Sequence, residues 1–171
     1  MTLAISSLDP LALYADQKKF DCEHALINKF VAGSLRQQVA KKLSAAFVLV
    51  DTELENKFVG FYTCSMASLD RGMLASLSKG SLPHQLPCVR IGMLGIDKRY
   101  KNQQLGSRLL RHAIVNMVAT RHIGCYGMTL DADAAAVDFY LKNGFTLLEE
   151  RKDPNPTPMF LHIETAIQSI E

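Results

Sequence analysis

The fold is decided by residues 88–106, which read CVRIGMLGIDKRYKNQQLG. The first half is short, mostly apolar and interrupted by glycines, a pattern typical of a buried strand with a bulge or a close backbone contact. The second half is polar and basic, and it is expected to connect that strand to the next element. From Leu105 onward, apolar residues recur along one face, which predicts an amphipathic helix. The stretch therefore predicts a strand, a basic loop and a helix in succession.

The start of this helix is a candidate anion site. Gly106 lies in the first turn, so backbone N–H groups without intrahelical partners and the positive end of the helix dipole face the loop. A phosphate group fits such an N-terminus. Basic loops between a strand and a helix are more often solvated connections, so this loop alone does not distinguish the two interpretations.

A second pattern follows at residues 130–145, which read LDADAAAVDFYLKNGF. Asp133 is expected to cap an alanine-rich helix, and Asn143 with Gly144 is expected to end it in a left-handed conformation. The residues by themselves predict a short capped helix whose aromatic side chains pack inward. In that interpretation Tyr140 is a core aromatic residue with its hydroxyl group satisfied.

Taken in this order, the two stretches resemble the acetyl-CoA site of GNAT N-acetyltransferases. In that family a loop of pattern Gln/Arg-x-x-Gly-x-Gly/Ala wraps the cofactor pyrophosphate. Here Lys101 stands at the first position, Gln104 replaces the first glycine, and Gly106 is retained. A side chain at Gln104 is compatible with this turn if its φ is negative, but it narrows the backbone approach that glycine allows. The family's closing pattern, Asn-x-x-Ala-x-x-Phe/Tyr-Tyr-x-x-x-Gly-Phe, has Asp133 at its Asn position and is otherwise matched by Ala136, Phe139, Tyr140, Gly144 and Phe145.

The resemblance implies the roles of individual residues. Tyr140 is the expected general acid, because a phenol with a pKa near 10 is protonated at pH 7 and can donate to a departing thiolate. Backbone N–H groups near Leu94, Gly95 and Ile96 are expected to hold the pantetheine arm and stabilise the oxyanion. The other implied cofactor-binding residues are Lys101, Asn102, Gln103, Gln104, Leu105, Gly106, Ser107, Asp133 and Phe139. No general base is favoured among Asp131, Asp97 and His112, and water alone is the alternative.

The chain is also similar to the GNAT-type toxins of bacterial toxin–antitoxin pairs, and this similarity covers nearly its whole length. It rests on residues 20–22, 26, 28–30, 37–38, 46–51, 59–63, 86–87 and 158–159. This resemblance implies an acetyl-CoA-dependent enzyme that acetylates the α-amino group of aminoacyl-tRNA and blocks translation. It also implies a ribbon–helix–helix antitoxin and a homodimer. The chain departs from many of these toxins by carrying Met93 in place of arginine and by lacking glycines at Asn102 and Gln104.

Two alternative functions stay open. One is a GNAT acetyltransferase of a small amine or a protein amino group, which the modest net charge of +2 favours over a polyanionic substrate. The other is a GNAT-fold partner-binding protein with weak catalytic activity, which the glutamine at position 104 supports and the retained Tyr140 opposes. Exposed basic residues along residues 26–43 become relevant if the substrate is RNA; they are Lys29, Arg36, Lys41 and Lys42.

Length and composition predict one domain over residues 1–171. The 48% hydrophobic and 21% charged residues are typical of a globular protein. The cysteines and histidines are scattered without metal-ligand spacing. The first residues lack the pattern of a signal peptide, and no apolar run reaches membrane-spanning length, so a cytoplasmic protein is expected.

The predicted architecture is α/β: a GNAT fold with a mixed, mostly antiparallel sheet of six to seven strands and helices on both faces. Besides the central strand, strands are expected at residues 3–5, 45–51, 57–64, 126–130, 145–149 and 159–163. A single apolar stripe predicts one helix over residues 26–43. Residues 68–87 are expected to form a loop with a short helix at 73–77, and residues 153–158 to be irregular because of their prolines.

Overall fold

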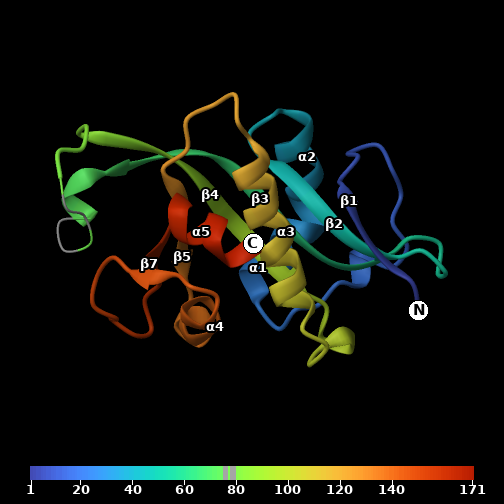
Figure 1. The fold of residues 1–171 in the computed structure, drawn as a ribbon. Coiled ribbons are helices and arrows are strands. Elements are labelled where there is room, and N and C mark those ends of the chain that lie inside the picture. The colour runs from blue at the N-terminus through green and yellow to red at the C-terminus, as the bar shows by residue number, and fades with distance from the viewer. Residues whose placement is uncertain (75–76, 78–79) are drawn as a thin grey trace. The chain divides into compact units, whose positions relative to one another are not determined.

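A computed structural model describes residues 1–74, 77 and 80–171 (Figure 1). Its strands are β1 (Leu3–Ser7), β2 (Ala45–Asp51), β3 (Lys57–Asp70), β4 (Gln85–Ile96), β5 (Gly127–Ala132), β6 (Thr146–Leu147) and β7 (Thr157–His162). The α-helices are α1 (Ala25–Gly33), α2 (Leu35–Ala40), α3 (Leu105–Ala119), α4 (Val137–Lys142) and α5 (Ile163–Ile170). Four 3-10 helices complete the fold: η1 (Gln17–Lys19), η2 (Arg71–Leu74), η3 (Lys98–Tyr100) and η4 (Ala134–Ala136). No helix in this part of the chain is long and apolar enough to cross a membrane.

The strands form one seven-stranded sheet in the order β1-β2-β3-β4-β5-β7-β6. The pair β4–β5 is parallel, whereas β1–β2, β2–β3, β5–β7 and β6–β7 are antiparallel. The mixed, mostly antiparallel sheet and the α/β class are therefore confirmed. The chain divides into two compact units, here called the first unit (Met1–Ser65 and Gly92–Ala113) and the second unit (Met66–Ile91 and Ile114–Glu171). That they make up a single domain stays a prediction.

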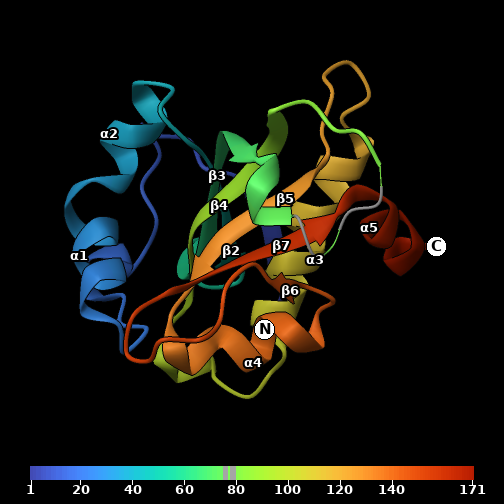
Figure 2. The ribbon, with the colours of Figure 1, turned by 90° about the vertical axis from the view of Figure 1, so that its left-hand side faces the viewer.

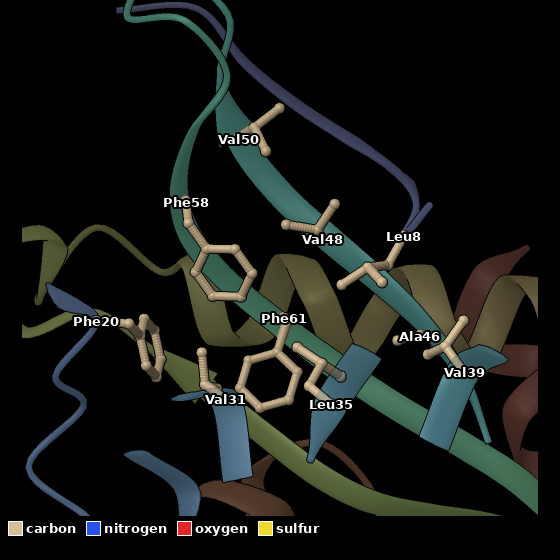
Figure 3. Close-up of a cluster of buried hydrophobic side chains, with 10 residues drawn as sticks. All are labelled: Leu8, Phe20, Val31, Leu35, Val39, Ala46, Val48, Val50, Phe58 and Phe61. Carbon is tan, nitrogen blue, oxygen red and sulfur yellow. The ribbon is translucent and has the colours of Figure 1, made fainter. Parts of the chain in front are cut away.

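The first unit is organised around β2 and β3, whose inward side chains meet α1 and α2. Phe58 and Phe61 are fully buried, and Phe20 packs edge-on against both rings at centroid distances of 5.2 and 5.8 Å. Val31 and Leu35 come to this cluster from the two helices, as Figure 3 shows. Burying such side chains stabilises the unit by roughly 1.5–3 kcal/mol each. This packing fixes the helices that precede the predicted cofactor loop.

The second unit holds β5, β7 and the short β6, with α4 following β5 in the chain (Figure 2). The parallel ladder of β4 with β5 pairs Cys88–Arg90 with Gly127–Thr129. A small core of Leu69, Leu74, Leu86, Cys88 and Phe160 anchors the strands. The last residues of β4, from Gly92 onward, lie beyond this ladder and belong to the first unit.

The helix predicted over residues 26–43 is in fact two helices. Ser34 ends α1 and begins α2, and the stripe that looked continuous is interrupted there. Leu26 and Leu43, both assigned to the apolar stripe, are 71% and 59% exposed. The prediction was wrong at these ends because Leu26 lies in the first turn of α1, whose one buried residue is Val31, and Leu43 lies beyond the end of α2 at Ala40.

The predicted loop at 68–87 is also shorter than expected, because β3 continues to Asp70 and β4 already begins at Gln85. The short helix lies earlier, at η2, and part of its predicted span, residues 75–76, lies outside the described residues. Long strands gain ladder hydrogen bonds that no local residue pattern reports.

The C-terminal prediction needs three corrections. The strand expected at 145–149 covers only Thr146–Leu147, and β7 begins at Thr157, within the segment predicted to be irregular. Pro158 fits β7 because its carbonyl accepts a hydrogen bond from the Leu148 N–H at 2.9 Å, and proline keeps its acceptor although it lacks a donor. Helix α5 was not predicted; His162 caps it by accepting from the Glu164 N–H at 3.1 Å.

Candidate active site

The predicted cofactor loop begins at a buried carboxylate. Asp97 is fully buried at the end of β4, and its N–H donates to the Val59 carbonyl of β3 at 2.8 Å. Its carboxylate accepts from the Arg99 N–H at 3.0 Å, from Arg99 Nε at 2.8 Å and Nη2 at 2.9 Å, and from the Asp21 N–H at 3.3 Å. Burial by itself raises the pKa of Asp97, but these hydrogen bonds outweigh it and hold the pKa below its ordinary value. Asp97 therefore fixes the loop and is not placed to act as a base.

The last residues of β4 are held close to their neighbours by two glycines. A Cβ added to Gly60 of β3 would lie 2.9 Å from the Gly95 carbonyl oxygen and 2.5 Å from Ile96 Cδ1. A Cβ at Gly95 would meet Ile27 Cγ2 at 3.2 Å and Phe20 Cζ at 3.3 Å. Position 95 thus brings the backbone of β4 close to the segment around α1, where a Cβ would require its neighbours to shift by a few tenths of an ångström.

The loop that follows adopts left-handed backbone conformations without glycine. Asn102 has φ +61° and Gln104 has φ +56°, so the negative φ at which a side chain fits this turn without strain is not adopted at Gln104. The chain retains the conformation that glycine provides in the family pattern, and it does so with a residue for which that conformation is unfavourable. The side chains of Asn102, Gln103 and Gln104 are all exposed.

Helix α3 starts directly after this loop. The Gln104 carbonyl accepts the Arg108 N–H at 3.1 Å, which makes Gln104 the residue that precedes the first turn. The N–H groups of Leu105, Gly106 and Ser107 then have no intrahelical acceptor and lie at the positive end of the dipole. Leu105 is buried and anchors the turn, while Gly106 and Ser107 are half-buried. This arrangement fits a pyrophosphate group, because its oxygens are the acceptors that such N–H groups need.

The cations of the loop are paired within the first unit. Lys101 forms an ion pair with Glu23, and Lys98 pairs with Asp21 at 2.7 Å. Arg99 is held by Asp97 and also lies 3.4 Å from an Asp16 carboxylate oxygen. Of these three cations, Lys101 pairs with an exposed carboxylate, so its pair is the one that a competing phosphate can open most easily.

In the second unit, α4 carries the predicted acid. Tyr140 is 8% exposed, and its ring packs edge-on against Phe139 and Phe145 at centroid distances of 5.0 and 5.5 Å. Burial, with a smaller contribution from the charge of Asp133, raises the pKa of Tyr140 to about 12. The phenol is therefore fully protonated at neutral pH and able to donate. Asp133 precedes η4, but its side chain makes no capping hydrogen bond, so the predicted cap was wrong.

The other two candidate bases have different surroundings. Asp131 is exposed and pairs with Arg90 at 2.8 Å. His112 Nδ1 lies 2.9 Å from the Tyr62 hydroxyl oxygen, and burial lowers the pKa of His112, so the imidazole is neutral at pH 7. Neither residue is a free base at the surface.

Comparison with known proteins agrees with this geometry. The model of the acetyltransferase (GNAT) family matches residues 14–145, which include the loop, α3 and α4. The chain belongs to the GNAT acetyltransferase family. The fold predicted from the two motifs, the acetyltransferase class and acetyl-CoA as donor are thereby confirmed.

Solved structures of GNAT proteins are similar over nearly the whole chain. A bacterial toxin is 29% identical with a TM-score of 0.94, covering 99% of this chain and 95% of the toxin. The toxin AtaT complexed with acetyl-methionyl-tRNAfMet is 26% identical with a TM-score of 0.86, covering 99% and 100%. A tyrosine-to-phenylalanine AtaT mutant bound to acetyl-CoA and to the C-terminus of the antitoxin AtaR is 25% identical with a TM-score of 0.82, covering 98% of each chain. The resemblance to GNAT-type toxins is confirmed.

The structure of this GNAT protein groups the predicted site residues by unit. In the first unit, β4, η3, the loop and α3 bring together Leu94, Gly95, Ile96 and residues 101–107. In the second unit, η4 and α4 bring together Asp133, Phe139 and Tyr140. The individual roles of these residues stay predictions.

Sequence reasoning missed two residues that shape the loop. Glu23 is the partner of Lys101, and no sequence signal joins residues so far apart. Thr63 accepts the Met93 N–H through its hydroxyl oxygen at 3.0 Å, which ties down β4 before the loop. The one sequence signal for this contact was a threonine within a mostly apolar predicted strand.

Proposed function

We propose that this protein is an N-acetyltransferase toxin that transfers the acetyl group of acetyl-CoA to the α-amino group of aminoacyl-tRNA. One structural observation supports the cofactor site above all others: the left-handed conformation at Gln104 leads directly into the free N–H groups of α3. The choice of acceptor rests on the similarity to AtaT, which was solved with acetyl-methionyl-tRNAfMet.

The residues that hold acetyl-CoA follow from the loop. The N–H groups of Leu105, Gly106 and Ser107 bind the pyrophosphate oxygens, and Lys101 contributes a cation when its pair with Glu23 opens. Bound acetyl-CoA supplies an acetyl thioester. The N–H groups of Leu94 and Ile96 are the donors for the developing oxyanion, since this part of β4 lies beyond its ladder with β5. The N–H group of Gly95 is in phase with those of Met93 and Asp97, which donate to Thr63 and Val59 of β3.

Tyr140 supplies the proton for the leaving thiolate. Its pKa of about 12 keeps the phenol protonated, so the group is in its acidic form at every physiological pH. The attacking nitrogen must be neutral and loses a proton to water as the amide forms. We assign neither carboxylate as base, because Asp97 is fully hydrogen-bonded and Asp131 is paired with Arg90.

The basic residues of α1 and the segment after α2 support an RNA acceptor. Lys29, Lys41 and Lys42 are exposed, whereas Arg36 is only partly exposed and donates to Gln17 Oε1 at 2.9 Å. We assign phosphate contacts to the three lysines. Such contacts make binding salt-dependent, with a slope of about 0.7–0.9 in log affinity against log salt for each phosphate neutralised.

The toxin function carries further assignments. We infer a cytoplasmic homodimer, because aminoacyl-tRNA is found in the cytoplasm and apolar side chains such as Met66 and Ile123 are exposed. We also infer a ribbon–helix–helix antitoxin, by similarity to the AtaT structure that contains the C-terminus of AtaR.

A cell-free translation reaction tests the proposal. Adding the protein with acetyl-CoA is expected to stop translation, and fresh charged tRNA is expected to restore it once the protein has been removed. The protein without acetyl-CoA is the control and leaves translation running. Continued translation in the presence of both components would contradict the toxin function.

A further inference from the structure

The first unit has a hollow that the acetyl-transfer chemistry does not use. It has a volume of about 620 Å³ and lies among η1, α1 and α2. Leu13, Tyr14 and Val31 form the apolar part of its lining. Leu13 is 85% exposed and the nearby Leu11 is 88% exposed, so the apolar surface continues beyond the hollow. A hollow of this size with an apolar border accommodates a bulky side chain of another molecule.

The charge at this hollow is positive. Lys18, Lys19 and Arg36 line it together with a single carboxylate, Asp16. That carboxylate already lies 3.2 Å from Lys19, 3.6 Å from Lys57 and 3.4 Å from Arg99. Among the described residues, Lys18 and Arg36 form no ion pair. The hollow therefore attracts a ligand that carries negative charge beside its apolar group.

Gln17 gives the hollow a fixed polar wall. Its side chain is more than nine-tenths buried, and its Oε1 accepts from Arg36 Nη2 at 2.9 Å, which holds the guanidinium group in place. The amide NH₂ of Gln17 has no hydrogen-bond partner within the described part of the chain. This NH₂ group is not a buried atom, so it is open to donate to an acceptor that a ligand supplies.

We propose that this hollow binds a peptide segment of a partner protein in which a large apolar side chain is flanked by Asp or Glu. The apolar side chain enters against Leu13, Tyr14 and Val31, and the carboxylates face Lys18, Lys19 and Arg36. RNA phosphates match the charge but leave Leu11 and Leu13 uncovered, so the apolar border favours a peptide. This surface adjoins the cofactor loop, because Asp16 pairs with Arg99, but none of the predicted acetyl-transfer residues lines it. The proposal holds whether or not the acceptor is tRNA.

A sequence-blind selection tests the chemistry of the ligand. A library of random peptides is selected on the full-length protein, and the selection is repeated on the double variant Lys18→Glu, Lys19→Glu. Both lysines are exposed, so the substitutions are compatible with folding, and circular dichroism confirms it. We expect wild-type protein to enrich peptides with an apolar residue between acidic residues, and the double variant to lose them. Enrichment without this pattern, no enrichment, or enrichment that the variant leaves unchanged would overturn the proposal.

A titration then separates the hollow from general electrostatics. The enriched peptide, labelled with fluorescein, is titrated by anisotropy against wild type, the double variant, Leu13→Asp and a control with Lys29→Glu and Lys41→Glu. The control changes net charge by the same amount, but neither of its residues lines the hollow. Affinity is expected to fall about tenfold or more in the double variant and in Leu13→Asp, and to change little in the control. An equal loss in the control, or unchanged affinity in Leu13→Asp, would refute a specific site.

Uncharged tRNA serves as the competing ligand. If the hollow binds peptide, the Lys18→Glu, Lys19→Glu variant keeps tRNA affinity within a small factor of wild type while it loses the peptide. If that variant loses tRNA and keeps the peptide, the surface belongs to RNA and the proposal is wrong.

Discussion

Replacing Gln104 with glycine is expected to stabilise the protein and to strengthen acetyl-CoA binding. Gln104 has φ +56°, a left-handed conformation that costs a residue with a side chain roughly 1–2 kcal/mol. Glycine removes this cost but adds roughly 0.4–1 kcal/mol of unfolded-state entropy. The net gain in the free energy of unfolding therefore lies between roughly 0 and 1.6 kcal/mol and is centred at about 0.8 kcal/mol. For a protein of this size such a gain raises Tm by up to about 2–4 °C.

The matched control is Gln103→Gly. Gln103 is a neighbouring exposed glutamine of the same loop, but its φ is not positive, so glycine there relieves no strain. In that variant the free energy of unfolding should fall by about 0.4–1 kcal/mol, because glycine increases the conformational entropy of the unfolded chain. Urea denaturation of the two variants and of wild type measures both changes. A loss of stability in Gln104→Gly equal to that of the control would refute the conclusion that Gln104 is strained.

Calorimetric titration with acetyl-CoA measures the second consequence. A glycine at position 104 removes the side chain beside the first turn of α3, so a pyrophosphate can approach the backbone more closely. The variant should bind acetyl-CoA more tightly than wild type, and Gln103→Gly should not. Weaker binding in Gln104→Gly would mean that the glutamine side chain itself contacts the cofactor.

Three further predictions concern single groups. Tyr140→Phe keeps the ring packing against Phe139 and Phe145, so unfolding should be little changed while the acetyl-transfer rate falls about 100-fold or more; a wild-type rate would make Tyr140 structural. Because the pKa of Tyr140 is raised to about 12, the pH–rate profile should rise as the amine deprotonates and show no descending limb from Tyr140 below about pH 11; a fall near pH 9 would assign the acid to another group. The pKa of Asp97 is lower in the folded protein than its unfolded value near 3.9, so its stabilisation is present above pH 4 and is lost as pH falls below it. Asp97→Asn should lower the free energy of unfolding by about 2–3 kcal/mol at pH 7 and should weaken its decrease at acidic pH. If urea denaturation shows the same decrease at acidic pH as in wild type, this prediction is contradicted.

The sequence was most informative where residue type and local conformation agree. The strand, loop and helix at residues 88–106 were predictable because glycines, basic residues and an amphipathic repeat follow one another in a fixed order. Gly144 has the positive φ that was expected at the end of α4. The short turn between the predicted strands at 45–51 and 57–64 has positive φ values at Glu55 and Asn56.

The remaining features depend on contacts between distant residues. Asp97 was considered as a base because a carboxylate beside a basic loop can titrate, but its burial against Arg99 and Asp21 is a tertiary feature. The pair of Lys101 with Glu23 is equally invisible in the sequence. Gln104 shows the opposite case: a residue with a side chain disfavours a left-handed conformation, yet the surrounding loop holds Gln104 in that conformation. Leu26 follows an apolar pattern yet is exposed, and periodicity cannot distinguish a core face from a binding face.

The acceptor is tested most directly by following the acetyl group. The protein is incubated with radiolabelled acetyl-CoA and a pool of charged tRNA, with uncharged tRNA and the Tyr140→Phe variant as parallel controls. The RNA is then treated with base, which releases esterified amino acids for identification. We expect label in N-acetyl amino acids from charged tRNA, none with uncharged tRNA, and little with the Tyr140→Phe variant. Label found only on protein lysines or on added polyamines would contradict the tRNA-acetylating function and favour a small-amine or protein acceptor.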